Sequence, residues 1–269
     1  MDRLLCLVIY IIAALAGFTK LLARLGICSY EEWQPGQKLK LLLVGYNGAD
    51  NTGSDVRTAA IAKQFKDLFG SDRIRITVMT LDARAVQGYF DEDVDLLPFS
   101  SLFPLHIYRA CSRHHAAVLC EGSTLKSTFA NALTLFMCAT AGIMAAQRKP
   151  CIAFGSEIGA MEPFLETAAA VLCRRAYFIT RTQASLTALK RLGLQGHAGT
   201  DAAWLYGRAA ETEEAERLLR QQGWDGKKPL LGLAVINPFC WPVRASLLRW
   251  IRAAVSGNRS GQYDKWYFY

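Results

Sequence analysis

The sequence predicts an α/β fold: a Rossmann-like parallel sheet with helices on both faces. Strand-like apolar runs alternate with helix-like segments from about residue 38 onward, which is the pattern of repeated strand–helix units. Nearly every strand-like run is continuously apolar, as expected of parallel strands that are buried on both faces. Polar turns follow these runs, and in such sheets the turns after the strands are where ligands bind.

The expected elements follow a short polar linker at residues 33–36. Apolar runs and β-branched residues predict strands at 39–45, 74–80, 94–99, 116–120, 151–155, 176–180 and 196–200. Apolar residues at helical spacing predict helices at 56–69, 102–112, 130–147, 162–174 and 183–192.

A second unit is expected near the C-terminus. A polar helix at 211–222 with Gly223 as its C-cap is followed by a strand-like run at 230–236 and a helical pattern at 245–255. We therefore divide the chain into an N-terminal segment (1–33), a Rossmann-like domain (38–226) and the start of a second α/β domain with an irregular tail (227–269). One strand and one helix cannot bury both faces of a sheet, so we expect this second domain to be truncated or docked on the first.

The charge is concentrated at the C-terminal end. The net charge is +8, and residues 227–269 contribute +6 of it, from seven basic residues and one acidic residue. A nucleic-acid protein is expected to show a basic stripe interleaved with aromatic residues, so we expect no nucleic-acid partner. An anionic small substrate or an anionic membrane surface fits the charge equally well.

The cysteines and histidines give no sign of a metal site. None of the eight cysteines forms a CxxC pair, and no Cys/His cluster has zinc spacing. Most lie in apolar runs, which indicates buried free thiols in a reducing compartment. The four histidines stand outside any recognisable hydrolase motif, so a catalytic triad is poorly supported.

The N-terminus is strongly apolar. Residues 4–18 carry no charge, and extension to residue 25 reaches the length of about 20 residues that a spanning helix needs, with Lys20 and Arg24 on one face. A signal peptide, a spanning anchor, a monotopic helix and a long helix packed on the protein are the alternatives. We expect one helix that does not join the main core and attaches the chain to the cytoplasmic face of a membrane.

Five turns at successive strand ends contain the candidate binding residues. They are Gly45, Asn47, Asn51, Gly53 and Ser54 in the first turn, Glu121, Gly122 and Ser123 in the second, then Glu157, Arg181 and Asp201. Glycines let a backbone approach a ligand, and a helix N-terminus offers free amides to an anion. The first turn has neither GxGxxG nor P-loop spacing, and Ser54 or Asp55 would equally serve as a helix cap.

Charged residues in these turns allow two interpretations each. Glu121 would orient a sugar hydroxyl or act as a base, or lie solvated in a turn. Arg181 would grip a phosphate or carboxylate, or form a salt bridge to Glu157 or Asp201. Together the five turns would line one ligand site.

The order of these motifs resembles the polysaccharide pyruvyl transferase family over about residues 39–205. The segments that carry the resemblance are GYNGADNTGSD, LCEGST, KPCIAFGSEIG, RTQASLTALKRLGL and GTDAAWL. The chain departs from the family at Glu121–Ser123, where two or three glycines are usual, and at Thr182, where an acidic residue commonly follows the arginine. The family also has a second Rossmann-like domain of comparable size.

The resemblance implies the first half of a two-domain, glycosyltransferase-B-like architecture with a truncated second domain. It implies transfer of a pyruvyl group from phosphoenolpyruvate to saccharide hydroxyls, as a ketal, in bacterial cell-envelope polysaccharide synthesis. Arg181 would then pair with phosphoenolpyruvate, and residues 45–53 with Glu121 and Glu157 would bind the acceptor. No metal or further cofactor is implied, and no residue is assigned as the acid that protonates the methylene carbon.

Two other functions are compatible with the sequence. A nucleotide-sugar-dependent glycosyltransferase of similar two-domain fold would place its nucleotide mainly on the second domain. A non-catalytic partial chain would bind a partner instead. Binding of phosphoenolpyruvate rather than nucleotide sugars would separate the first interpretation from the second.

Overall fold

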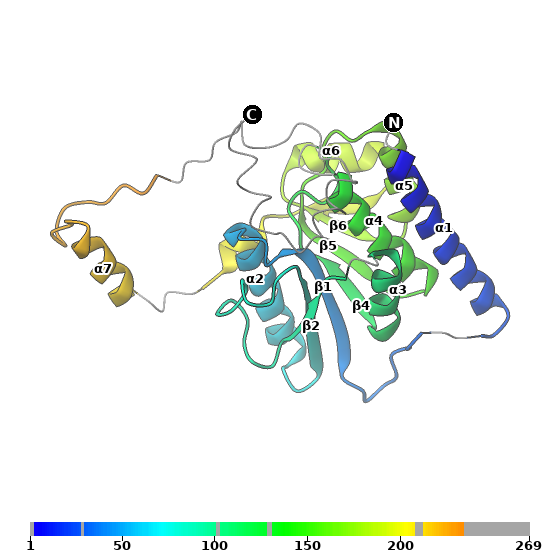
Figure 1. Ribbon diagram of the computed structural model, residues 1–269, viewed down its shortest axis with the longest axis horizontal. Helices are drawn as coiled ribbons and strands as arrows, with labels where there is room; N and C mark the ends of the chain where they lie inside the picture. Colours follow the sequence, from blue (N-terminus) through cyan, green and yellow to red (C-terminus); the bar gives the residue numbers. More distant parts are fainter. Residues whose placement is uncertain (1–2, 28–29, 101–102, 128–130, 208–211, 234–269) are drawn as a thin grey trace.

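A seven-stranded parallel sheet organises the chain (Figure 1). The computed structural model describes residues 3–27, 30–100, 103–127, 131–207 and 212–233. The strands are β1 (Leu39–Asn47), β2 (Ile74–Thr80), β3 (Asp95–Pro98), β4 (Ala116–Leu119), β5 (Cys151–Ser156), β6 (Tyr177–Thr180) and β7 (Gln195–Ala198). Each lies within two residues of its expected range, and every neighbouring pair is parallel, which confirms the Rossmann-like α/β fold.

The strand order β3-β2-β1-β4-β5-β6-β7 reverses direction at β1. From β1 the chain moves outward through β2 and β3, then returns to add β4 on the other side of β1 and continues outward to β7. Leu41 pairs with Ala116 and Val44 with Leu119 at this reversal. In open parallel sheets the ligand site lies beyond the carboxyl ends of the strands at such a point.

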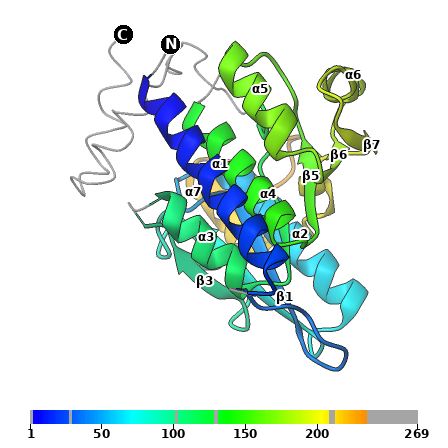
Figure 2. The same ribbon diagram turned by 90° about the vertical axis from the view of Figure 1, so that its right-hand side faces the viewer.

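Helices cover the two faces unequally (Figure 2). The helices are α1 (Arg3–Arg24), α2 (Thr52–Phe69), α3 (Phe103–Arg113), α4 (Asn131–Ala146), α5 (Pro163–Leu172), α6 (Gln183–Arg191), the 3₁₀ turn η1 (Ala202–Leu205) and α7 (Thr212–Gln221). Helix α2 and η1 pack together on one face, whereas α3, α4 and α5 pack on the other. The right-handed crossover rule requires this division, because the chain adds strands in opposite directions on either side of β1.

The alternation of side chains along β1 builds two cores. Leu42 and Val44 point into the cluster beneath α3 and α4, and Leu41 and Leu43 point into the cluster beneath α2. All four are essentially inaccessible to solvent. The continuous apolar run therefore reflects burial on both faces, as its composition predicts.

Helix α1 joins the core, so the expectation that it stands apart is wrong. The expected single helix is present, but it packs along α4, and Val8, Ile9 and Ile12 belong to the same buried cluster as the sheet. The reason lies in α4, which is apolar all round and has its outward face covered by α1. A helix of that kind needs cover on every side.

The C-terminal segment differs from expectation in its described part. Helix α7 is present, and its expected bounds hold within a residue. Residues 230–233 form no strand and are exposed, so the strand expected at 230–236 is absent from the part that the structure describes. The remainder of that strand and the helix expected at 245–255 lie outside the described residues.

Candidate functional site

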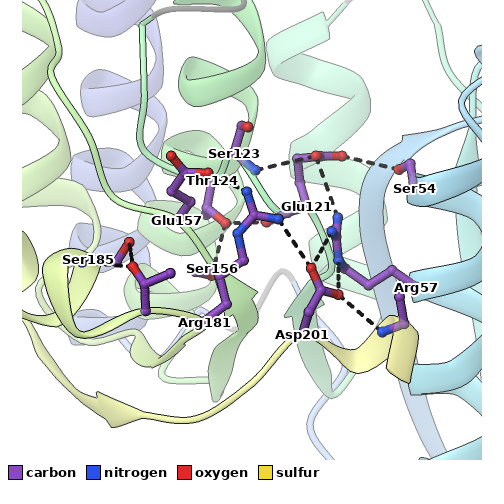
Figure 3. A network of polar contacts seen from close by, with 12 residues as sticks. Ser54, Arg57, Glu121, Ser123, Thr124, Ser156, Glu157, Arg181, Ser185 and Asp201 are labelled. Carbon is purple, nitrogen blue, oxygen red and sulfur yellow. Dashed lines mark hydrogen bonds and ion pairs between the residues drawn. The ribbon is translucent and has the colours of Figure 1, made fainter. Parts of the chain in front are cut away.

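The carboxyl ends of four strands bring charged side chains together at one edge of the sheet (Figure 3). Glu121 follows β4, Glu157 follows β5, Arg181 follows β6 and Asp201 follows β7. Arg57 reaches them from α2, on the other side of the reversal point. We call these five residues and Lys126 the edge network.

The turn between β1 and α2 is built on backbone geometry that its sequence permits. Gly48 has a φ of 69°, and a Cβ there would lie 2.3 Å from the carbonyl oxygen of Asp82, so only glycine fits. Asn51 caps α2, its side-chain oxygen accepting from the Ser54 amide at 3.3 Å. The cap is therefore Asn51, whereas Ser54 and Asp55, the two caps that the sequence offers, lie inside the first turn of α2.

Carboxylate side chains of the protein accept hydrogen bonds from the backbone amides that would bind a phosphate in a dinucleotide site. Asp55 accepts from the Gly48 amide at 3.0 Å, and Glu121 accepts from the Tyr46 amide at 3.3 Å and the Ser54 hydroxyl at 3.1 Å. Burial raises the pKa of Asp55, an effect that the Gly48 amide opposes. A phosphate at this turn would meet two carboxylates, which disfavours phosphate binding there.

Arg57 connects the two sides of the sheet. Its Nε donates to Oδ1 of Asp201 at 2.9 Å and its Nη2 donates to Oδ2 at 2.7 Å, a two-pronged ion pair. Its Nη1 lies 3.8 Å from Oε1 of Glu121. Burial opposes the charge on Arg57, but its bonds to Asp201 and the nearby Glu121 outweigh burial and raise its pKa above the usual value.

Arg181 continues the network toward solvent. Its Nη1 donates to Oδ2 of Asp201 at 3.1 Å and its Nη2 donates to Oε2 of Glu157. Lys126 donates to the other oxygen of Glu157 at 2.5 Å. The salt-bridge interpretation of Arg181 thus holds for both carboxylates that the sequence offers as partners.

Gly122 leaves room for the two guanidinium groups. A Cβ at this position would lie 2.8 Å from Nη1 of Arg57 and 3.0 Å from Nη1 of Arg181. The Gly122 carbonyl also accepts from the Glu157 amide at 2.5 Å, which joins the turn after β4 to the turn after β5. The structure thus assigns this glycine a steric role at the centre of the network.

Two carboxylates of the network, Asp201 and Glu157, have lowered pKa values. Burial alone would raise the pKa of Asp201, but the bonds from Arg57 and the Ala203 amide and the charge of Arg57 outweigh it and lower the pKa to about 2. The pKa of Glu157 is likewise lowered, since Lys126 and Arg181 outweigh its burial. With Glu121, three carboxylates face three cations.

One end of the network is partly exposed to solvent, and the other end is buried. The side chains of Lys126, Glu157 and Arg181 are 22, 25 and 28% exposed, whereas those of Arg57 and Glu121 are 9% exposed. A cavity of about 420 Å³ lies elsewhere, beside Tyr30, Tyr108 and Arg113 at the end of α3. That cavity contains none of the network residues, and the open end of the network is where a ligand would gain access.

Several expected residues support the site without lining it. Asn47 is fully buried and its Nδ2 donates to the Met79 carbonyl at 3.1 Å, so it ties β1 to β2. Gly45 lies within β1 and Gly53 within α2, where they shape the backbone. The Ser123 amide donates to Glu121 at 3.4 Å. Among these four, only Ser123 contacts the edge network directly.

Arg57 and Lys126 were missing from the sequence-based set. Arg57 lies three residues after Ser54, but the helix expected from the sequence starts only at residue 56, so their i,i+3 relation appears only in the observed α2. Lys126 follows Glu121 by five residues and had no such signal. Among the described residues, no group of three or more His, Cys, Asp or Glu side chains is placed to hold a metal ion.

Comparisons with known proteins do not show a family. No family model and no curated protein matches the chain. One solved structure with a distant likeness is a triphenylmethane reductase of Citrobacter sp., described in connection with bioremediation of triphenylmethane dyes, with a TM-score of 0.36 and 10% sequence identity. The match covers 53% of this chain and 49% of that one, so the chain spans about half the length of that reductase.

Proposed function

We propose that this protein is a polysaccharide pyruvyl transferase-like enzyme whose edge network binds the saccharide acceptor. The observation that supports the proposal is the set of three carboxylates, Glu121, Glu157 and Asp201, gathered around two arginines at the carboxyl edge. The motifs that resemble the family contribute all three carboxylates. Arg57, which precedes the second of those motifs, adds the connecting cation.

The charge balance of the network suits a neutral polyhydroxyl ligand. Three cations and three carboxylates balance one another, so a neutral sugar brings no unbalanced charge into the network. Carboxylates accept strongly from hydroxyl groups, and guanidinium groups donate to hydroxyl oxygens. Glu157, at the exposed end, is the proposed first contact of the sugar.

The low pKa of the carboxylates limits their chemical role. A general base works best when its pKa lies near the operating pH, and Glu157 and Asp201 have pKa values below their usual ones. We therefore assign them to orienting the acceptor hydroxyls rather than to removing their protons. Lys126 and Arg181 are the proposed contacts for the carboxylate or phosphate of phosphoenolpyruvate.

The proposed reaction balances as follows. Two hydroxyls of one saccharide form two C–O bonds to C2 of phosphoenolpyruvate, and the C2–O bond to phosphate breaks. One hydroxyl proton is delivered to the methylene carbon, which becomes a methyl group, and the other leaves with inorganic phosphate. The network fixes the two hydroxyls in one orientation, which supplies proximity and alignment.

The experiment compares donors on the whole chain. Phosphoenolpyruvate and a set of nucleotide sugars are added separately, and the midpoint of thermal unfolding is measured. A rise with phosphoenolpyruvate alone supports the proposal, and its use is then followed by phosphate release and by the new methyl signal in proton NMR with methyl pyranosides. A rise with nucleotide sugars alone would identify a glycosyltransferase, and no rise with either would indicate a non-catalytic binding protein.

A further inference from the structure

Helix α1 has two apolar faces, of which one packs on the core and the other is largely exposed, apart from a ring contact of Tyr10 with Phe164. Val8, Ile12 and Ala16 recur at helical spacing and are buried against the core. The opposite face carries Leu7, Tyr10, Ile11, Phe18 and Leu21, and Leu25 follows in the turn after the helix; the six side chains are 54, 65, 41, 57, 52 and 65% exposed. We call these six residues the outer stripe. A stripe of this length on one helix is more than scattered surface apolar residues account for.

The packing of α1 argues against a role as a spanning helix. Residues Cys6–Arg24 have the length and hydropathy to cross a membrane, and within the described chain no other helix does. Insertion across a bilayer would remove Ile12 and its neighbours from the core and uncover the outer face of α4. Because α4 is apolar on all sides, that exposure would be costly.

Exposed basic side chains occur on the C-terminal half of α1 and on its neighbour α3. Lys20 and Arg24 are exposed on α1, and Arg109 and Arg113 are exposed on α3, which lies beside α1 (Figure 2). Within the described residues, none of these four has a carboxylate within salt-bridge distance. Many surface cations elsewhere are paired, as Arg75 is with Asp95.

We propose that α1 is a monotopic membrane-docking helix that remains packed on the domain. Its axis lies in the plane of the membrane, the outer stripe enters the boundary between headgroups and acyl chains, and the bases contact anionic headgroups. A second copy paired through α1 would bring apolar side chains but no acidic ones to these bases, because α1 contains no Asp or Glu. An anionic lipid surface satisfies both, and this proposal does not depend on the proposed function.

Flotation with lipid vesicles tests this arrangement. The whole chain is mixed with vesicles of phosphatidylcholine, with and without phosphatidylglycerol, and the fraction that floats is measured at low and high salt. We expect binding to the anionic vesicles that weakens with salt. Phe18→Glu is expected to lower partitioning by about tenfold or more, and Lys20→Ala with Arg24→Ala by about fivefold for each base.

Matched variants on the other side of the sheet serve as controls. Leu68 on α2 is 74% exposed and Arg73 has an 80% exposed side chain, so Leu68→Glu and Arg73→Ala make the same chemical changes away from α1. Both are expected to bind vesicles as the unaltered chain does. Circular dichroism and the unfolding midpoint confirm that each variant folds.

Four results would overturn the proposal. If Phe18→Glu floated as well as the unaltered chain, the outer stripe would not be part of the membrane contact. A dimer that Phe18→Glu dissociates, with no vesicle binding, would make a second copy the partner. If all of the membrane-bound chain resisted alkaline extraction through α1, α1 would be a spanning helix. Recovery of the chain cleaved after α1 would indicate a signal peptide.

Discussion

Arg57 and Asp201 lie 144 positions apart in the sequence and form a two-pronged ion pair, with Nε–Oδ1 and Nη2–Oδ2 distances of 2.9 and 2.7 Å. Arg57 comes from the helix after β1 and Asp201 from the turn after β7. The pair therefore joins the centre of the sheet to its far edge. If this ion pair is broken, the side chains at the carboxyl ends of the strands are no longer held together as one site.

Asp201→Asn is expected to destabilise the fold by about 1–3 kcal/mol, because it removes the charge of the carboxylate that hydrogen-bonds the buried guanidinium of Arg57. Urea unfolding measures the change. Asp95→Asn is the matched control, since Asp95 holds Arg75 through the same two-pronged pattern on the exposed surface. The control is expected to cost at most about 1 kcal/mol. If the two variants lost the same unfolding free energy, burial would not be what makes the Arg57–Asp201 pair important for stability.

Stability is expected to fall with acid through a defined window. Asp201 has a pKa of about 2 in the folded protein against 3.8 for the ordinary group, so the unfolded chain takes up its proton first as pH falls. The stabilisation is fully present above the ordinary value and is lost as pH falls from about 4 to about 2. The measurement is the unfolding free energy of the unaltered chain and Asp201→Asn across this range. The difference between them should shrink in acid, and a constant difference would show that folding does not shift the pKa of Asp201.

Gly122→Ala is expected to displace the two guanidinium groups, since the added methyl would lie within 3.0 Å of both. We expect a stability loss of about 1–3 kcal/mol, typical of overpacking, together with weakened saccharide binding. Gly207→Ala is the control, because a Cβ there meets nothing within 4 Å. Calorimetric titration with methyl pyranosides and urea unfolding are read together. Unchanged binding in Gly122→Ala would place the ligand away from these arginines.

The buried thiol next to the network is expected to resist alkylation. Burial raises the pKa of Cys120 to about 12, and Cys120 immediately precedes Glu121 at the end of β4. At pH near 8 its thiol is therefore almost wholly protonated and poorly nucleophilic. Iodoacetamide should leave the Cys120 peptide unmodified in the folded chain and modify it fully in urea, as mass spectrometry would show. Rapid modification of Cys120 in the folded chain would mean that solvent reaches the buried end of the network.

Local pattern was sufficient to predict most of the fold. The apolar run at Leu41–Val44 and the polar turns after the strands follow from burial and strand–helix alternation, and these are properties of neighbouring residues. The same reasoning placed Glu121, Glu157, Arg181 and Asp201 at strand ends, and the structure brings them together. Parallel strands whose ends share one edge make such a prediction possible.

Two features could not be predicted, because they depend on long-range packing that a local sequence pattern does not reveal. Arg57 lies within a helix whose polar and apolar residues look ordinary, and its partner Asp201 is identified only once the sheet order is known. Helix α1 is apolar on most of its surface, so periodicity could not show which face meets α4. Its inward face is set by the need of α4 for cover, which is a long-range property.

Acceptor binding by Glu157→Gln is the most direct test of the edge network as a saccharide site. The substitution keeps the size of the side chain but removes the charge that faces Lys126 and Arg181. Titration calorimetry with methyl glucoside, galactoside and mannoside compares it with the unaltered chain and with Glu166→Gln, an exposed glutamate in the first turn of α5. We expect the best-bound glycoside to lose about 1–3 kcal/mol of affinity in Glu157→Gln and none in the control. Equal affinity in all three proteins would contradict a saccharide site at the edge network.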